Sequence, residues 1–335
     1  MIGEAIRRVV LREDLSADEA RGVMDEIMSG ACTPAQIAAF LTAMRMKGES
    51  IDEITACAEV MRAKCLRLRP EGDVLEIVGT GGDGAATINI STIAGFVISA
   101  AGVPVAKHGN RAVSSQCGSA DVLESLGVKL DIPAERSAEI LREIGLCFLF
   151  APLYHSSMKY AAPVRREMGV RTIFNILGPR ANPAGANMQL LGVYDESLVE
   201  PLARVLLNLG VKRAMVAHGH DGLDEITLTA SSTVCEVHDG RLNSFFLDPR
   251  QFGFALCQPE DLVGGGPSEN AEIARALLEG RRGPKRDAVV LNAAVSLYLA
   301  RPDRTLRDCV RLAGETIDSG KALAQLERFV TLTNA

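Results

Sequence analysis

The sequence lacks several features that mark common classes of protein. None of its eight cysteines forms a C-x-x-C pair, which argues against a zinc ribbon or a thioredoxin-like redox site. Scattered cysteines in a chain of this length are typical of small buried side chains in a reducing compartment. Positive charge is not in excess either. The net charge is −6, so the surface as a whole is unsuited to coating a polyanion such as DNA.

Long apolar segments are also missing. The first fifteen residues carry six charged side chains and hold no apolar core of a secretory signal. The longest apolar run, near residues 93–106, is interrupted by glycine and proline and falls short of the roughly 20 residues that span a bilayer. These absences predict a soluble protein of the cytoplasm. Its 335 residues, 47% of them hydrophobic, suffice for one large or two ordinary domains.

The first 69 residues contain helix signals only. Ser16, Thr33 and Ser50 each precede a Glu or Gln by three positions, which is the spacing of a capping box. Apolar residues then follow at helical spacing, as in residues 37–44. Residues 1–69 are therefore predicted to form a small all-helical domain.

From residue 70 onward, short apolar runs alternate with helical patterns. This alternation predicts an α/β domain over residues 70–335, with a mostly parallel central sheet covered by helices. A helical segment near 163–184 is expected to pack on the N-terminal domain. An Asp-Gly turn predicts a hairpin over 236–242. The expected strands are 74–78, 102–106, 147–151, 188–193, 213–219 and 225–229, and the expected helices include 93–101, 133–144 and 197–209.

The stretch "EIVGTGGDGAATINIST", residues 76–92, joins the first expected strand to a helix. Free N–H groups and the dipole at the helix start near Asn89 favour an anion. Asp83 would repel a bare phosphate, so it indicates a sugar phosphate or a metal. Neither the Walker A pattern nor the dinucleotide pattern G-x-G-x-x-G fits, and a tight turn without a ligand is the alternative. The glycines that allow positive φ and close backbone approach are Gly79, Gly81, Gly82 and Gly84.

A basic cluster follows the second expected strand, within "AKHGNRAVSSQCGSADVLESLGV", residues 106–128. Ligands of parallel sheets bind at the carboxyl ends of the strands. The cluster mixes cations with small hydroxyl donors, which favours anion binding over the alternative, a solvated basic turn. Its polar members are Lys107, His108, Asn110, Arg111, Ser114, Ser115 and Ser119.

A third polar stretch is rich in basic side chains. An arginine there, such as Arg165, could hold a carboxylate in a bidentate pair. The alternative is a solvated basic helix face. The basic residues within 150–185 are His155, Lys159, Arg165, Arg166 and Arg171.

Adjacent acids, Asp224 and Glu225, precede the expected strand at 225–229. Hard oxygen ligands of this kind suit Mg²⁺, which bridges substrate phosphates and keeps part of its water shell. His218 and His220 lie close in sequence, but no cysteine or third histidine is near them, which argues against zinc.

No Ser-His-Asp pattern and no obvious nucleophile accompany these groups. Such a set suits a reaction in which the ligand already carries an excellent leaving group, while the protein positions it and stabilises charge. A magnesium diphosphate departing from a sugar is a group of this kind.

The motifs "GTGGDG…NIST", "KHGNRAVSS", "GSADVLE", "APVRRE-GVRTIFN-LGP-NP" and "DE" occur in one order along the chain. In this the sequence resembles the anthranilate phosphoribosyltransferase family over nearly its whole length. The resemblance implies a fold of the nucleoside phosphorylase/phosphoribosyltransferase class. It also implies transfer of the phosphoribosyl group from 5-phosphoribosyl 1-diphosphate to anthranilate, the second step of tryptophan biosynthesis.

The resemblance also implies roles for individual residues. Anthranilate would contact Gly79, Asn110 and Arg165, with His108 and His155 near its ring. Ser91, Asp224 and Glu225 would hold two magnesium ions per subunit. No covalent nucleophile is expected, and the family is typically a homodimer joined through the helical domain. The diphosphate–ribose site would comprise Gly79, Gly82, Asp83, Thr87, Asn89, Ile90, Ser91, Thr92, Lys107, His108, Gly109, Asn110, Arg111, Ala112, Val113, Ser114, Ser115 and Ser119.

Two alternatives share this fold. A pyrimidine nucleoside phosphorylase would need phosphate as its nucleophile, and the "NIST" and Asp-Glu elements argue against it. A nucleic-acid-binding homologue should present a basic surface, whereas this chain is acidic. Magnesium-dependent binding of phosphoribosyl diphosphate would separate the transferase from both.

Overall fold

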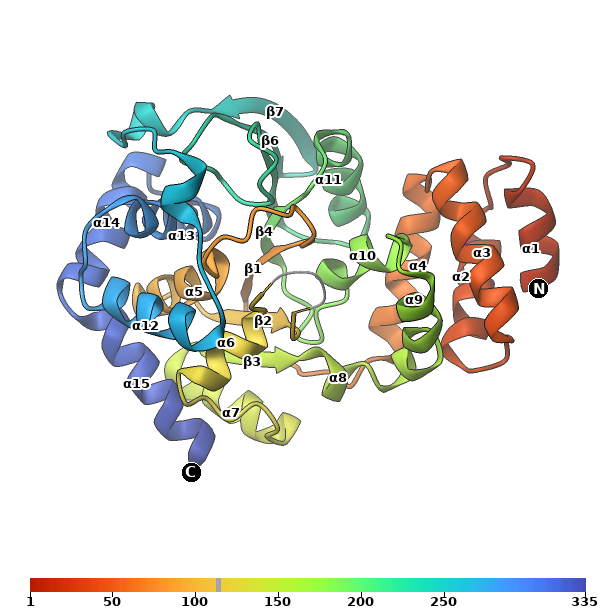
Figure 1. Ribbon diagram of the computed structural model, residues 1–335, viewed down its shortest axis with the longest axis horizontal. Coiled ribbons are helices and arrows are strands. Elements are labelled where there is room, and N and C mark those ends of the chain that lie inside the picture. The colour runs from red at the N-terminus through yellow and green to blue at the C-terminus, as the bar shows by residue number, and fades with distance from the viewer. Residues whose placement is uncertain (113–115) are drawn as a thin grey trace.

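The structure is a computed structural model that describes residues 1–112 and 116–335. A helical bundle lies beside a larger α/β domain, and the amino terminus lies at the far end of the bundle (Figure 1). The bundle contains α1 (Ile2–Val9), α2 (Ala17–Met28), α3 (Pro34–Lys47) and α4 (Ile51–Lys64). No helix in the described part of the chain is long and apolar enough to cross a membrane.

The three expected capping boxes are confirmed at the starts of α2, α3 and α4. Ser16, Thr33 and Ser50 each accept a hydrogen bond from the backbone N–H three residues on, and the Glu or Gln there accepts one in return. Each cap stabilises its helix by about 1 kcal/mol. Local sequence therefore sets where these helices begin.

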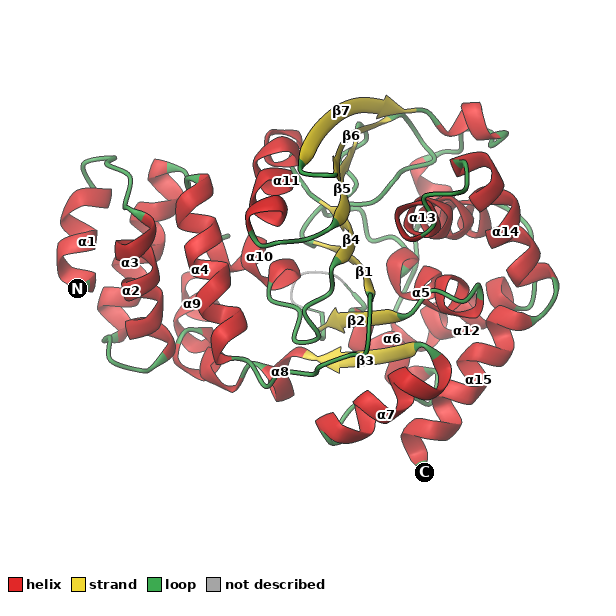
Figure 2. Ribbon diagram, turned by 180° about the vertical axis from the view of Figure 1, so that it is seen from behind, coloured by secondary structure: helices red, strands yellow, loops and turns green. Residues whose placement is uncertain are grey.

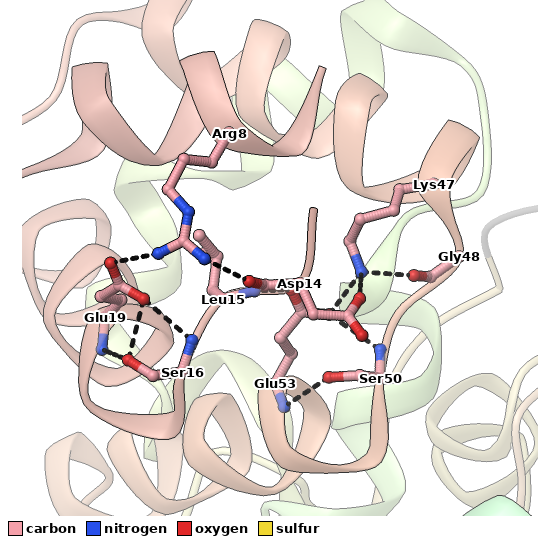
Figure 3. A network of polar contacts seen from close by, with 9 residues as sticks. All are labelled: Arg8, Asp14, Leu15, Ser16, Glu19, Lys47, Gly48, Ser50 and Glu53. Atoms are coloured by element: carbon pink, nitrogen blue, oxygen red, sulfur yellow. Dashed lines mark hydrogen bonds and ion pairs between the residues drawn. The ribbon is translucent and has the colours of Figure 1, made fainter. Parts of the chain in front are cut away.

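One of these caps also joins the loops of the bundle. Glu53 is fully buried, and its carboxylate accepts hydrogen bonds from Leu15 N at 2.9 Å and from Ser50 N at 2.8 Å (Figure 3). Lys47 Nζ lies 2.8 Å from the same carboxylate and is itself almost fully buried. Removing one partner of such a buried pair typically costs 3–5 kcal/mol, because the other charge is left uncompensated.

A later segment of the chain returns to the bundle. α9 (Ala162–Met168) contacts α3, and α10 (Ile173–Leu177) contacts α4. Figures 1 and 2 show α10 between the bundle and the strands, and α9 alongside the helices of the bundle. Apolar side chains of the bundle, of this segment and of one sheet face form a continuous buried cluster.

Within the described residues, the central sheet has seven strands in the order β3-β2-β1-β4-β5-β6-β7. The first five strands pair in parallel, whereas β6 pairs antiparallel with both β5 and β7, so the predicted mostly parallel α/β fold is confirmed. The Asp-Gly turn of the expected hairpin joins β6 to β7, with both turn residues at positive φ. The strands are β1 (Leu75–Gly79), β2 (Val105–Gly109), β3 (Leu146–Phe150), β4 (Met188–Gly192), β5 (Arg213–Gly219), β6 (Ser232–His238) and β7 (Arg241–Leu247).

Helices cover both faces of the sheet (Figure 2). Side chains alternate along β4, so that Leu190 joins the core on one face and Leu191 the core on the other. The face of Leu191 is covered by α10 and α11 (Val199–Asn208). The other face is covered by α5 (Ile90–Ala100), α6 (Ser119–Ser125), α12 (Pro267–Leu278), α13 (Pro284–Ala300), α14 (Leu306–Asp318) and α15 (Lys321–Asn334). The remaining α-helices are α7 (Ala134–Ile144) and α8 (Ala151–Tyr154).

One expected strand is wrong. Residues 225–229 are irregular, although Ile226 and Leu228 are buried as in a strand. Their backbone groups bond to side chains in place of a neighbouring strand: the amide of Asn292 bonds both the N–H and the carbonyl of Ile226. Ser232 Oγ accepts from Thr227 N in the same way. The short apolar run correctly predicted burial, but it gave no sign of these side-chain partners.

Candidate functional site

The site lies where β1 and β4 end side by side. After β1 the chain turns towards β2, and it later returns on the other side as β4, which makes this edge a topological switch point. Gly79 and Gly192 face each other in register at the two strand ends. A Cβ on Gly79 would lie 2.8 Å from Asp224 Cγ, and one on Gly192 would overlap the Asp224 backbone. Both glycines therefore make room for the acidic loop.

The acidic pair contacts both segments of the glycine-rich stretch. Asp224 Oδ2 accepts a hydrogen bond from Gly81 N at 2.6 Å, and Glu225 Oε1 accepts one from Ser91 N at 3.2 Å. The expected free N–H groups at the start of α5 are thus partly used by this carboxylate. Burial, followed by the charges of Asp83 and Glu225, raises the pKa of Asp224 well above its ordinary value. Burial raises the pKa of Glu225 to about 7, against the opposing effect of Lys107.

Crowded, buried carboxylates of this kind call for a cation. Among the described residues, no three His, Cys, Asp or Glu side chains converge into an all-protein metal cage. Mg²⁺ is commonly bound through one or two carboxylates, with water and substrate phosphates completing its shell. The donor set of Asp224, Glu225 and the nearby Ser91 hydroxyl fits that ion.

Lys107 lies beside the acidic pair and Ser91. Its side chain is buried, and Nζ donates hydrogen bonds to the Ile77 carbonyl at 2.8 Å and to Ser91 Oγ at 3.1 Å. Burial lowers the pKa of Lys107, while the charge of Glu225 opposes that effect. The ammonium therefore lies among the acids and the hydroxyl that follow the glycine loop.

The remaining residues of the glycine-rich stretch have mixed environments. Thr87 forms a bridge with Val263, and Asn89 bonds the Cys117 carbonyl and the Asn270 amide. The side chains of Ile90 and Thr92 are buried in α5, so only their backbone could face a ligand.

The loop after β2 is shaped by a residue that the sequence analysis did not single out. Asp121 Oδ2 accepts hydrogen bonds from Ala112 N at 2.8 Å and Gly118 N at 2.9 Å. Its position three residues after Gly118, at the start of α6, was the available signal. The guanidinium of Arg111 forms ion pairs with Glu124 at 2.7 Å and with Asp121, so its charge is already compensated by the protein.

Other members of the expected cluster are spread along the same loop. Gly109 ends β2 against Ser119 and Phe148, and Ser119 Oγ donates to the Asn110 carbonyl at 3.3 Å. The expected contacts Val113, Ser114 and Ser115 lie outside the described residues.

A second group of expected residues gathers beside β2. His108 and His155 are both buried, with ring centroids 5.0 Å apart. His108 Nε2 and both ring nitrogens of His155 have no hydrogen-bond partner within the described residues. Burial lowers the pKa of His108 to about 3 and that of His155 to about 4, so both rings are neutral at pH 7.

Arg165 lies on α9, in the segment that packs on the bundle. Its guanidinium carbon is 5.1 Å above the centre of the Phe174 ring, and burial lowers its pKa. None of the ion pairs found within residues 1–112 and 116–335 involves this side chain. The two histidines that lie close in sequence each have a partner in the protein: His218 Nδ1 lies 2.8 Å from the Val193 carbonyl, and His220 Nε2 lies 2.8 Å from Thr233 Oγ1.

Two residues that contact the glycine loop were not placed there by the sequence analysis. Arg171 was noted only as one of several cations, and Tyr194 was not singled out. Arg171 donates a hydrogen bond to the Gly82 carbonyl and stacks on the Tyr194 ring. The "GVRT" stretch follows the basic helix directly, but sequence spacing gives no sign of a partner so distant in the chain.

Comparison with known families covers both domains. Residues 3–65 match the model of the glycosyl transferase family helical bundle domain, and residues 71–323 match that of the glycosyl transferase family a/b domain. The chain is 67% identical over 335 residues to an anthranilate phosphoribosyltransferase from Ruminiclostridium cellulolyticum, covering 100% of this chain and 98% of the relative. It is 59% identical to one from Methanobrevibacter smithii, with 100% of both chains covered.

Solved structures give the same result. An anthranilate phosphoribosyltransferase from Thermus thermophilus superimposes with a TM-score of 0.94 at 45% identity, covering 99% of both chains. A yeast enzyme of the same name, in complex with PRPP and Mg, has a TM-score of 0.91 at 28% identity and covers 99% of this chain and 98% of its own. A complex of the yeast enzyme with 4-fluoroanthranilate has a TM-score of 0.90 at 27% identity, over 99% and 97%.

Proposed function

Since this chain belongs to the anthranilate phosphoribosyltransferase family, we propose that the glycine loop after β1 holds 5-phosphoribosyl 1-diphosphate and that Arg165 faces the carboxylate of anthranilate. The activity is that of the family: a glycosyltransferase reaction of tryptophan biosynthesis that joins the phosphoribosyl group to the anthranilate amine. The observation that carries the site assignment is the packing of Asp224 against Gly79 and Gly192, with its carboxylate on Gly81 N.

The donor half would bind the diphosphate and ribose through the loops that follow β1 and β2. Ser91, Asp224 and Glu225 would hold two magnesium ions per subunit, which supply charge neutralisation to the departing diphosphate. Lys107 would add a positive charge beside them. Backbone N–H groups of residues 79–92, and the loop of residues 107–115 together with Ser119, would complete the contacts to the donor. No covalent nucleophile is required.

The acceptor half would orient the aromatic amine. Arg165 would pair with the carboxylate, with Gly79 and Asn110 contacting the acceptor and His108 and His155 near its ring. The bond from the amine nitrogen to the anomeric carbon forms as the bond from that carbon to diphosphate breaks, and the nitrogen then loses a proton. Neutral imidazoles add no positive charge near the ribose, where positive charge develops in the transition state. A site shielded from water would limit hydrolysis of the donor.

The assembly is a further part of the proposal. α1 and α3 present a groove lined by Val9, Val10 and Met46, and the last two side chains are 60% and 71% exposed. Exposed apolar surface on a helical face is typical of a protein interface. We propose that a second copy of the chain covers it in a cytoplasmic homodimer. The helical domain would comprise residues 1–69 with the segment 163–184 packed on it, and the α/β domain residues 70–335.

The test is the loss of anthranilate fluorescence when phosphoribosyl diphosphate and magnesium are added. Turnover that depends on all three components is expected. Calorimetric titration of the donor with and without Mg²⁺ checks the donor half separately. Donor affinity that is the same with and without Mg²⁺ would contradict the assignment of Asp224 and Glu225 as magnesium ligands. Phosphate-dependent cleavage of a pyrimidine nucleoside, with no anthranilate turnover, would favour the phosphorylase alternative.

A further inference from the structure

We infer that Arg171 is a positioning residue, which fixes the glycine loop of the donor half from the segment that carries Arg165. Arg171 lies between α9 and α10, the two helices packed on the bundle. Its Nη2 donates a hydrogen bond to the Gly82 carbonyl, 89 residues away in sequence. Its guanidinium carbon lies 4.0 Å from the centre of the Tyr194 ring. Two independent contacts thus hold one exposed side chain in place.

Three successive residues of the glycine loop have three different partners. Thr80 N donates to the Gly192 carbonyl at 3.0 Å, where β4 ends. Gly81 N donates to Asp224 at 2.6 Å, and the Gly82 carbonyl accepts from Arg171. The first two partners belong to the α/β domain. The third comes from the segment packed on the bundle, so the loop bridges the two parts of the molecule.

The loop needs these partners because its backbone is soft. Gly81, Gly82 and Gly84 have φ of 71°, 80° and 76°, a region that other residues rarely adopt. A Cβ on Gly82 would lie 3.1 Å from Arg171 Nη2 and 3.3 Å from Nε. Glycine at this position therefore permits both the backbone turn and the close approach of the guanidinium.

Tyr194 serves as the platform for Arg171. Its backbone N–H donates to Thr80 Oγ1 at 3.2 Å, which fixes the tyrosine relative to the first residue of the loop. Cation–π contact is made by the face of the ring, so the phenol hydroxyl is dispensable. Arginine suits this position better than lysine, because a planar guanidinium stacks and donates at the same time.

The consequence is a coupling between the two substrates, and this step rests on the proposed function. Arg165 and Arg171 are separated by the end of α9, where Gly169 at φ 65° closes the helix on the Arg165 carbonyl. An acceptor held at Arg165 and a donor held by the glycine loop would then both act on one short segment. Coupling of this kind is reciprocal in binding free energy.

The test compares Arg171→Ala and Arg171→Lys with Arg166→Ala, an exposed arginine on α9 that serves as the matched control. Arg171→Ala is expected to raise KM for phosphoribosyl diphosphate about tenfold, with a smaller change in kcat and no loss of thermal stability. Arg171→Lys should fall between Arg171→Ala and the wild type, and Arg166→Ala should match the wild type. Equal donor KM values in Arg171→Ala and Arg166→Ala would overturn the inference.

Tyrosine variants supply a second measurement that does not require Arg171→Ala to fold. Tyr194→Phe should match the wild type, and Tyr194→Leu should raise the donor KM as Arg171→Ala does. Combining Tyr194→Leu with Arg171→Ala should add little, because both changes remove the same contact. Full additivity would refute the shared platform.

Donor binding with and without 2-hydroxybenzoate, an acceptor mimic without the amine, measures the coupling. The mimic should change the donor Kd of the wild type and leave that of Arg171→Ala unchanged. A wild type in which the mimic has no effect on donor Kd would contradict the coupling. A wild type that binds no donor at all would contradict the proposed function instead, so the two failures are distinguishable.

Discussion

The proposed donor half and the proposed acceptor half of the site satisfy their polar groups in different ways. In the donor half, Asp224, Glu225 and Lys107 all have hydrogen-bond partners in the protein. In the acceptor half, three buried nitrogens of His108 and His155 have none among the described residues. Buried polar atoms without partners are costly. The comparison teaches that the protein itself supplies the partners of the charged groups in the proposed donor half, whereas it leaves the two buried imidazoles of the proposed acceptor half with unused hydrogen-bonding atoms.

The strongest challenge to this view removes the acids of the donor half. Replacing Asp224→Asn together with Glu225→Gln keeps the side-chain size but removes both charges. We expect kcat/KM to fall by on the order of 1,000-fold or more and magnesium stimulation to disappear, because the charge on the diphosphate is then uncompensated. Initial rates over a magnesium titration measure both effects. Magnesium-stimulated turnover in the double variant would exclude these residues from the metal site.

A single methyl group tests whether the donor half depends on backbone packing. In Gly192→Ala, the new Cβ overlaps the Asp224 backbone, so the acidic loop must move. We expect a loss of about 2–3 kcal/mol in the free energy of unfolding and a loss of donor binding. Gly95→Ala is the matched control. Gly95 lies in α5, and a Cβ added there would have Val105 Cγ1, at 3.9 Å, as its near neighbour, which is an ordinary contact distance. If Gly192→Ala has the same free energy of unfolding and the same donor affinity as Gly95→Ala, the close packing of Gly192 on Asp224 does not contribute to stability or donor binding.

Arg165→Ala tests the acceptor half without disturbing the donor half. A charge-assisted pair with the anthranilate carboxylate is worth about 1.5–3 kcal/mol, so KM for anthranilate should rise roughly 10- to 100-fold. KM for phosphoribosyl diphosphate should change far less. Steady-state kinetics with each substrate varied in turn provide the measurement, with Arg166→Ala as the control. Equal increases in both KM values would show that the acceptor is placed wrongly.

The smallest expected effect is an acid sensitivity that arises in the acceptor half. Burial lowers the pKa of His155 to about 4, so below pH 6.5 the unfolded chain takes up a proton that the folded chain does not. The folded state with neutral His155 therefore keeps its full stability above pH 6.5 and loses part of it as the pH falls towards 4. At pH 5 the loss from His155 is about 2 kcal/mol. In His155→Gln, the fall in the urea midpoint from pH 7 to pH 5 should be smaller than in the wild type.

The control for this measurement is His238→Gln, on the exposed hairpin turn. That variant should lose as much stability as the wild type between pH 7 and pH 5. An unchanged acid sensitivity in His155→Gln would mean that His155 is not held neutral by burial.

Much of the fold could be predicted because its signals are local. The capping boxes, the Asp-Gly hairpin and the strands of the parallel sheet all formed near the expected residues. The strand expected at 102–106 lies at Val105–Gly109, since Gly102 belongs to the turn after α5 and the next two residues are irregular. The strand expected at 225–229 failed because Asn292, on α13, supplies the hydrogen bonds that a neighbouring strand would have supplied.

The sequence by itself determined which chemistry was available: a glycine loop after a strand, a basic cluster, and an acidic pair. These follow from residue type and short spacing, since backbone freedom and charge belong to single residues. Only the tertiary structure decided which of these residues contact one another. Gly81 meets Asp224 across 143 positions, and Gly82 meets Arg171 across 89. Contacts of that length depend on how strands stack and helices pack, and no local pattern of residues encodes them.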